Sequence, residues 1–278
     1  MKTNITYLFM AVLLLGCNTN QKKDDKSTTT AKDPDTAALL SSERHHEWVD
    51  LKREQGTFKA FVVYPEHNAV TDAVIVIHEN RGLNDWARSF ADQLAAKGYL
   101  VIAPDLLSNT VEGIVRTTDF EDSDKAREAI YNLDSLQVIK DLEASYEYVK
   151  NLESSTGKVS VIGFCWGGSQ AFNYAIANPN LENALVFYGT APKDKSTFSH
   201  IQTPIYGFYG GNDNRVNASI PDTKQAMEKY QKTYSPVIYK GAGHAYMRQG
   251  ANKEASELEK QAHDESWNRI LNILNDTP

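Results

Sequence analysis

Three residues in separate parts of the chain have the types and contexts that nucleophilic catalysis needs. Cys165 is the central residue of G-F-C-W-G, a pattern in which a nucleophile sits on a sharp turn between a strand and a helix. Asp213 ends the run Y-G-G-N-D, and His244 ends the run G-A-G-H. A thiol needs a base to take its proton and a third group to orient that base. The set therefore predicts a triad of Cys165, His244 and Asp213.

The segments around Cys165 have the composition that such a turn requires. Val159 to Ile162 is an apolar, β-branched run that predicts a buried strand, and residues 169–178 have helical composition. Glycines flank the cysteine because a Cβ there would clash with neighbouring backbone. The N-terminus of the following helix favours a thiolate. The alternative is a small buried thiol at a tight junction; the aspartate and histidine motifs favour the nucleophile.

The remaining chain alternates short apolar runs with helical stretches. Residues 47–52 and 57–65 predict an opening β-hairpin, followed by strands at 73–78, 99–103, 184–188, 205–209 and 236–239. Helices are predicted at 86–97, 123–152 (one helix or two), 219–232 and 251–274. This alternation predicts an α/β fold with a mostly parallel central sheet covered by helices on both faces. The three candidate residues follow strands, so they would meet at the carboxyl edge of the sheet.

The N-terminus has the features of an exported protein. Lys2, an apolar run from Tyr7 to Leu15 and the sequence L-L-G-C resemble a bacterial lipoprotein signal, which predicts a signal peptide at 1–16 and a lipid on Cys17. The alternative is an ordinary signal peptide that contains a cysteine. Residues 17–45 are polar and predict a disordered tether, leaving 46–278 as the folded domain. The expected location is the bacterial cell envelope, with a membrane as partner.

Bulk composition narrows the function classes. The chain of 278 residues is 41% hydrophobic and carries a formal net charge of −7 without a basic cluster in its folded part. Nucleic-acid binding is disfavoured, because phosphate neutralisation needs a basic face. Cys17 and Cys165 are the two cysteines, and their contexts differ too much to predict a disulfide. We expect a monomer without a cofactor.

The other histidines fit structural or surface positions. His78 ends a predicted strand beside the site, where a structural role is favoured over a catalytic one. The remaining five fall in predicted loop, tether or helix-surface positions: His45, His46, His67, His200 and His263. No set of cysteine, histidine and carboxylate residues has the spacing of metal ligands, so no metal site is predicted.

Longer motifs around the three residues carry a family resemblance. They are G-F-C-W-G-G, Y-G-G-N-D and G-A-G-H-A-Y-M-R, together with H-E-N-R-G from His78 and A-P-D-L from Ala103. From about residue 46 to the C-terminus the chain resembles the bacterial dienelactone hydrolases (carboxymethylenebutenolidases). These form a cysteine-nucleophile branch of the α/β-hydrolase superfamily, so the resemblance implies the α/β-hydrolase fold.

The resemblance also implies roles for further residues. Glu79 would contact the resting thiol, the backbone N–H groups of Asn80 and Trp166 would hold the oxyanion, and Arg248 would bind a substrate carboxylate. A second arginine is expected after A-P-D-L, where this chain has Asn109. An asparagine cannot pair with a carboxylate as a charged bidentate fork does.

Two other arginines, Arg81 and Arg116, are candidates to replace that missing charge, although each also fits a surface position. The sequence thus predicts a hydrolase of small esters or lactones that works through an acyl-thioester. Two alternatives remain open: a thioesterase or carboxylesterase for larger envelope substrates, and an inactive surface-anchored binding module. A thiolate is itself readily expelled and performs poorly against amides, so a protease is disfavoured.

Overall fold

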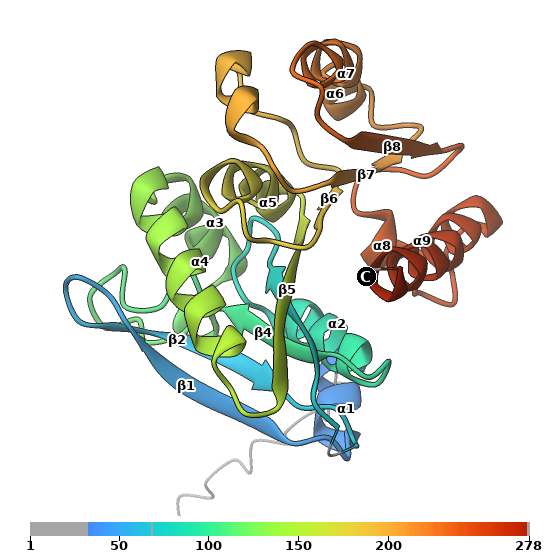
Figure 1. The fold of residues 1–278 in the computed structure, drawn as a ribbon. Coiled ribbons are helices and arrows are strands. Elements are labelled where there is room, and N and C mark those ends of the chain that lie inside the picture. Colours follow the sequence, from blue (N-terminus) through green and yellow to red (C-terminus); the bar gives the residue numbers. More distant parts are fainter. Residues whose placement is uncertain (1–32, 68, 277–278) are drawn as a thin grey trace, which may run out of the picture. The chain divides into compact units, whose positions relative to one another are not determined.

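The computed structural model describes residues 33–67 and 69–276. In this part of the chain the strands form one sheet in the order β1-β2-β4-β3-β5-β6-β7-β8 (Figure 1). β2 is antiparallel to both of its neighbours, and the other pairs from β4 to β8 are parallel. The predicted α/β fold with an opening hairpin is confirmed. The strands are β1 (His46–Lys52), β2 (Thr57–Val63), β3 (Thr71–Ile77), β4 (Leu100–Pro104), β5 (Ser155–Phe164), β6 (Ala184–Phe187), β7 (Ile205–Gly210) and β8 (Tyr234–Tyr239).

Helices cover both faces of the sheet. α4 (Ser135–Lys150), α5 (Trp166–Ala177) and α7 (Ile220–Lys229) pack on one face, whereas α2 (Asp85–Ala95) and α9 (Glu257–Asn275) pack on the other (Figure 1). The shorter elements are α1 (Pro34–Ser41), α3 (Ser123–Tyr131), α6 (Asn214–Asn217), α8 (Tyr246–Gln249), η1 (Thr117–Asp119) and η2 (Lys195–His200).

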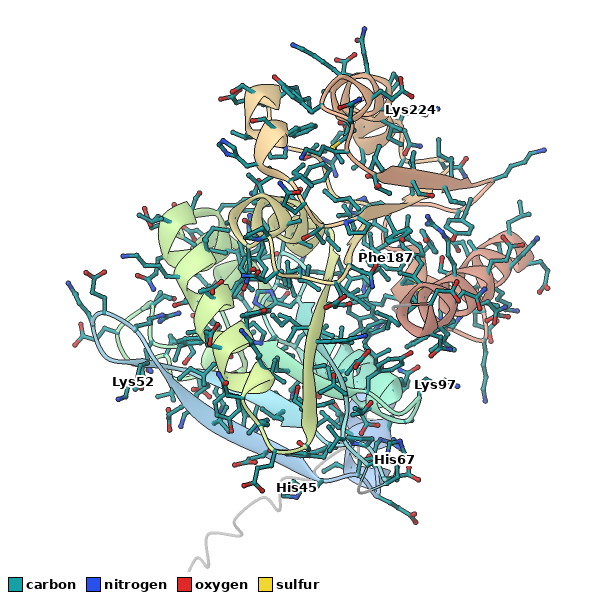
Figure 2. All side chains as sticks on the ribbon, in the orientation of Figure 1. His45, Lys52, His67, Lys97, Phe187 and Lys224 are labelled. Carbon is teal, nitrogen blue, oxygen red and sulfur yellow. The ribbon has the colours of Figure 1, made fainter. Side chains whose placement is uncertain are left out.

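Alternating side chains along the strands supply the two hydrophobic layers. In β3, Ile75 and Ile77 join the layer under α4 and α5, while Val74 and Val76 join the layer under α2 and α9. Successive side chains of a strand point to opposite faces, so an uninterrupted apolar run fills both layers. Figure 2 shows Phe187 in the interior, whereas Lys52, Lys97 and Lys224 extend outward.

The N-terminal part of the described chain differs from the prediction. Residues 34–41, expected in a disordered tether, form α1, which Asp33 caps by accepting from Asp35 N–H at 2.9 Å. Pro34 at the first helical position supports this start, because its missing N–H would have no helical partner. Ser42 then donates to Asp92 of α2 at 2.6 Å, and Arg44 pairs with the same carboxylate at 2.6 Å. Residues 33–45 therefore belong to the folded domain; Cys17 and the signal peptide lie outside the described residues.

The structure settles one helical prediction and corrects another. The stretch 123–152 is two helices, because Asp134 caps α4 by accepting from Gln137 N–H at 2.8 Å. α9 begins at Glu257 rather than at residue 251, because Ser256 provides its N-cap. Both caps satisfy backbone N–H groups that the first turn of a helix leaves without a partner.

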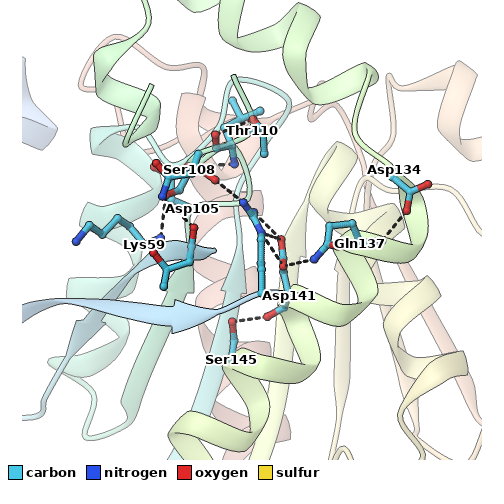
Figure 3. Close-up of polar contacts among 12 residues, drawn as sticks. Lys59, Asp105, Ser108, Thr110, Asp134, Gln137, Asp141 and Ser145 are labelled. Carbon is cyan, nitrogen blue, oxygen red and sulfur yellow. Dashed lines mark hydrogen bonds and ion pairs between the residues drawn. The ribbon is translucent and has the colours of Figure 1, made fainter. Parts of the chain in front are cut away.

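A buried polar network ties the hairpin to α4 and to the loop after β4 (Figure 3). Arg53, with a side chain 8% exposed, pairs with Asp141 of α4 at 2.7 Å. Arg53 also donates to the carbonyl oxygen of Ser108 at 2.6 Å, and Gln137 donates to Asp141 at 2.8 Å. Several polar atoms of this network are therefore satisfied away from water.

A second buried carboxylate, Asp105, holds the loop after β4. It accepts from the N–H and the hydroxyl of Thr117, each at 2.6 Å. Thr117 Oγ1 in turn accepts from Leu83 N–H at 3.0 Å, which fixes the loop after β3. Burial raises the pKa of Asp105 to about 6, and the hydrogen bonds from Thr117 oppose that shift.

Candidate active site

Cys165 lies at the turn between β5 and α5. Its backbone has φ +56° and ψ −114°, a conformation that L-residues rarely adopt. A Cβ on Gly163 would lie 2.0 Å from the carbonyl oxygen of Gly167, and a Cβ on Gly167 would lie 2.3 Å from that of His78. The strand and the helix therefore approach each other so closely that glycine is required on both sides of the cysteine.

The structure brings the three predicted triad residues together at the carboxyl edge of the sheet. His244, after β8, has Nε2 at 3.1 Å from Cys165 Sγ and Nδ1 at 2.5 Å from Asp213 Oδ2. Asp213, after β7, has a side chain 6% exposed and caps α6 by accepting from Val216 N–H at 3.4 Å. The base thus contacts the thiol through one nitrogen and the orienting carboxylate through the other.

The surroundings favour the protonated form of His244. Burial lowers its pKa, but the hydrogen bonds to Cys165 and Asp213 and the negative charges nearby outweigh burial and raise the pKa to about 9. An imidazolium can hold a thiolate at its Nε2 while Asp213 accepts from Nδ1. This arrangement suits a cysteine nucleophile.

Backbone strain gathers at this edge. Of the five non-glycine residues with positive φ in the described chain, three are Cys165, Tyr188 and Ala245. Tyr188 follows β6 with its ring centroid 5.0 Å from that of His244, and Ala245 directly follows the histidine. Each such residue costs about 1–3 kcal/mol, which the surrounding fold must offset.

Glu79 is buried beside the site and contacts groups other than the thiol. Arg248 donates to its Oε2 at 3.3 Å, and the Tyr188 hydroxyl donates to its Oε1 at 3.5 Å. Burial raises the pKa of Glu79, although Arg248 opposes the shift. Among the described hydrogen bonds, that of the thiol is with His244. The contact between Glu79 and Cys165 expected for a resting enzyme is not the arrangement seen here.

A cavity of about 450 Å³ opens over Cys165 and His244. Three arginines line it: Arg248, as predicted, and Arg127 of α3 and Arg215 of α6, which the sequence analysis did not single out. Only the position of Arg215, two residues after Asp213, offered a signal.

The two arginines proposed as replacements lie elsewhere. Arg81 pairs with Asp124 at 3.1 Å, and the guanidinium of Arg116 lies over the ring of Trp48. Asn109 donates from its side chain to the carbonyl oxygen of Thr57 at 2.9 Å.

The two predicted oxyanion donors lie in different segments, Asn80 after β3 and Trp166 after β5. Asn80 lines the cavity with Cys165, and its side chain donates to the Tyr131 hydroxyl at 3.1 Å. Trp166 is the first residue of α5, where backbone N–H groups have no partner within the helix.

No group of three or more histidine, cysteine or acidic side chains within the described chain could hold a metal ion. Likewise, none of the described helices is long and apolar enough to cross a membrane.

Comparisons with known proteins identify the family and the fold. The model of the Dienelactone hydrolase family matches residues 58–277. A protein of Saccharolobus solfataricus named "Putative carboxymethylenebutenolidase" is 31% identical over 247 residues, covering 78% of this chain and 93% of its own. A protein of Yersinia pestis with the same name is 30% identical over 227 residues, covering 76% of this chain and 81% of its own.

Solved structures show the same fold. The dienelactone hydrolase of Anabaena variabilis superposes with a TM-score of 0.61 at 19% identity, covering 81% of this chain and 96% of its own. A thermostable carboxylesterase from a metagenomic library superposes with a TM-score of 0.62 at 12% identity, covering 86% of this chain and 94% of its own.

The sheet, the turn carrying Cys165 and the loops after β7 and β8 thus define an α/β-hydrolase. Within that class, the chain belongs to the dienelactone hydrolase family. It is a carboxylic ester hydrolase of the carboxymethylenebutenolidase-like kind.

Proposed function

We propose that the protein hydrolyses small ester or lactone substrates through Cys165, with His244 as base and Asp213 as its orienting group. The observation that carries the proposal is the continuous chain of contacts from Sγ through the imidazole to the carboxylate, at 3.1 and 2.5 Å. Each contact joins groups of the kind that a nucleophile, a base and an orienter require.

The reaction follows from these contacts. The thiolate of Cys165 attacks the carbonyl carbon, and the Asn80 and Trp166 N–H groups bind the oxygen that becomes negative. As the tetrahedral intermediate collapses, His244 gives its proton to the leaving oxygen and an acyl-thioester remains. His244 then takes a proton from water, which attacks the thioester and releases the acid and Cys165.

The charges around the cavity favour an acidic substrate. The side chains of Arg127 and Arg215 have no hydrogen bond, ion pair or ring contact within the described residues, whereas the side chain of Arg248 pairs with Glu79. Guanidinium groups bind carboxylates through paired charge-assisted hydrogen bonds. We infer that Arg127 and Arg215 bind an anionic group of the ester or lactone, in place of the arginine that is absent after A-P-D-L.

Turnover by the full chain and by Cys165→Ala tests the mechanism. p-Nitrophenyl acetate and a dienelactone are suitable substrates, and the variant is expected to lose more than about 10⁴-fold in kcat on both. Mass spectrometry of acid-quenched wild-type enzyme should show an acyl group on Cys165. Equal turnover with and without Cys165 would refute the mechanism, and no turnover by either protein would leave a binding protein with a hydrolase fold.

A comparison of acidic and neutral substrates tests the arginines. Arg127→Gln or Arg215→Gln should lower kcat/KM for the dienelactone about tenfold, the value of one charge-assisted hydrogen bond of about 1.5 kcal/mol. Turnover of p-nitrophenyl acetate, which has no carboxylate, should stay unchanged. Arg116→Gln is the matched control, because Arg116 contacts Trp48 outside the cavity. Faster turnover of neutral thioesters than of any anionic ester would favour a thioesterase.

We also propose that a lipid on Cys17 holds the enzyme at the bacterial cell envelope as a monomer. The signal-like sequence before Cys17 supports this proposal. Labelling of cells with a radioactive fatty acid should mark the wild-type protein and leave Cys17→Ala unlabelled. Labelling of both would contradict the assignment of the anchor.

A further inference from the structure

One buried side chain contacts the peptide group that precedes Asn80 and the ring of Trp166, while remaining outside the cavity. His78 directly follows β3, is 0% exposed and does not line the cavity over Cys165. Its Nδ1 lies 2.8 Å from the carbonyl oxygen of Glu79, and its ring stacks on that of Trp166, with centroids 5.7 Å apart and planes 11° apart.

The first contact fixes which way a peptide group faces. A carbonyl oxygen only accepts hydrogen bonds, so Nδ1 of His78 carries the proton and donates to Glu79. The Glu79 carbonyl and the Asn80 N–H belong to one planar trans peptide and point in opposite directions. With the carbonyl turned toward the buried ring, the N–H faces away from that ring. Asn80 lines the cavity with Cys165, so this side is the substrate side.

The second contact fixes the other donor. The stacked ring packs against Trp166, the first residue of α5, and α5 approaches so closely that a Cβ on Gly167 would meet the backbone oxygen of His78 at 2.3 Å. The backbone that precedes Asn80 and the helix start that carries the Trp166 N–H therefore pack against the same residue.

His78 carries a cost in folding free energy that a purely apolar side chain would avoid. Its Nε2 is buried without a hydrogen-bond partner among the described residues. Burial also lowers the pKa of His78 to about 4, so the ring stays neutral with its proton on Nδ1. A buried acceptor left without a partner calls for an explanation other than packing.

We propose that His78 is a positioning residue for the oxyanion hole: its Nδ1–H holds the Glu79–Asn80 peptide so that the Asn80 N–H faces the thiol. This inference rests on the proposed thiol mechanism. His78 does not line the cavity over Cys165, so it acts through the backbone around the site rather than on the substrate. Without its hydrogen bond the peptide can rotate, and the hole loses one donor at the moment when negative charge develops on the carbonyl oxygen.

Two variants separate the hydrogen bond from the packing. His78→Phe keeps a ring of similar size against Trp166 and removes the Nδ1–H donor. His78→Asn removes the ring but places an amide N–H near the position of Nδ1. His200→Phe is the matched control, because His200 is exposed at the end of η2 and does not line the cavity over Cys165.

The readout compares two reactions of Cys165 in the full chain. Acylation by p-nitrophenyl acetate passes through an oxyanion, whereas alkylation by iodoacetamide is a direct displacement that forms none. His78→Phe should slow acylation and kcat roughly 10²-fold, the loss typical of one oxyanion donor, with KM and the alkylation rate unchanged. His78→Asn should recover at least part of the acylation rate, and His200→Phe should match the wild type.

The other outcomes overturn the inference. Equal losses in acylation and alkylation would show that His78 supports the nucleophile or the fold instead. An unchanged acylation rate in His78→Phe would show that the peptide needs no such donor. If His78→Phe does not fold, His78→Asn decides alone, and slow acylation with normal alkylation in that variant contradicts the donor role. A wild-type enzyme that is alkylated but never acylated would refute the proposed function itself, and the inference with it.

Discussion

Two polar clusters, both built on aspartates, behave in opposite ways. Around Arg53 and Asp141 the donors and acceptors meet each other in a closed set, with side chains 8% and 3% exposed (Figure 3). The cluster of Asp213, His244 and Cys165 is open at one end, where the thiol and the imidazole meet a cavity. His244 remains 33% exposed there.

Backbone strain is denser at the open cluster. Cys165, Tyr188 and Ala245 have positive φ there, whereas among the described residues the closed network has one such neighbour, Asn109, which follows Ser108. A closed polar network gives stability and a fixed geometry. An open one leaves a reactive group unsatisfied, and the strain around it is compatible with function rather than with stability. Hydrogen-bond closure, more than the residue types, therefore separates a structural aspartate from a catalytic one.

The greatest change that we predict is a fall in kcat, and it concerns the open cluster. Asp213→Asn should lower kcat by roughly 10³- to 10⁴-fold, because an amide can turn its NH₂ toward Nδ1 and favour the wrong tautomer of His244. The free energy of unfolding should change by less than about 1 kcal/mol, since the amide oxygen can still accept from Val216. Steady-state kinetics and urea unfolding measure the two quantities. A loss of stability as large as the kinetic loss would erase the distinction between the clusters.

The second predicted effect is a loss of stability rather than of activity, and it concerns the closed cluster. Asp141→Ala should lower the free energy of unfolding by about 3–5 kcal/mol, because Arg53 stays buried without its partner. The kcat per folded molecule should match the wild type, as measured in the same urea and kinetic assays. The double variant Arg53→Met with Asp141→Leu should regain most of the lost stability. A selective fall in kcat would mean that the network also positions the site.

A smaller effect concerns Asp105, whose folded-state pKa is raised from 3.8 to about 6. A raised pKa means that the folded state keeps the proton longer than the unfolded state does. The stabilising contribution of Asp105 is therefore lost as the pH rises from about 4 to 6, which lowers the free energy of unfolding by up to about 3 kcal/mol.

Urea unfolding at several pH values checks this dependence. Asp105→Asn has no carboxyl at that position, so its unfolding free energy should decrease less steeply across the same window. Equal slopes for the two proteins would show that Asp105 has an ordinary pKa.

The strands and site loops could be predicted because local sequence determines them. Apolar runs such as 73–78 must be buried on both faces, and residues that follow parallel strands share one edge. The contact set of Cys165, His244 and Asp213 followed from that rule and from the motifs.

Other features depend on neighbours that are distant in sequence. Arg127 and Arg215 reach the cavity from α3 and α6; Arg215 follows Asp213 by two residues, whereas nothing near Arg127 in the sequence indicates that it lines the same cavity. Likewise, Glu79 meets Arg248 rather than the thiol, because side-chain choice within a loop depends on the packed site. α1 has a polar composition that indicated disorder; capping by Asp33 and contacts to α2 stabilise it instead.

α1 also sets where the protein can be shortened. Asp33, Asp35 and Thr36 line a cavity of about 490 Å³ together with Glu79 and Arg248, and Thr36 donates to Asp85 of α2. A recombinant chain trimmed to begin at residue 46, where the family resemblance starts, would lose the α1 side of this cavity. It would also lose the hydrogen bonds that Ser42 and Arg44 donate to Asp92. Expression of the catalytic unit should therefore start at or before Asp33, with any affinity tag at the C-terminus.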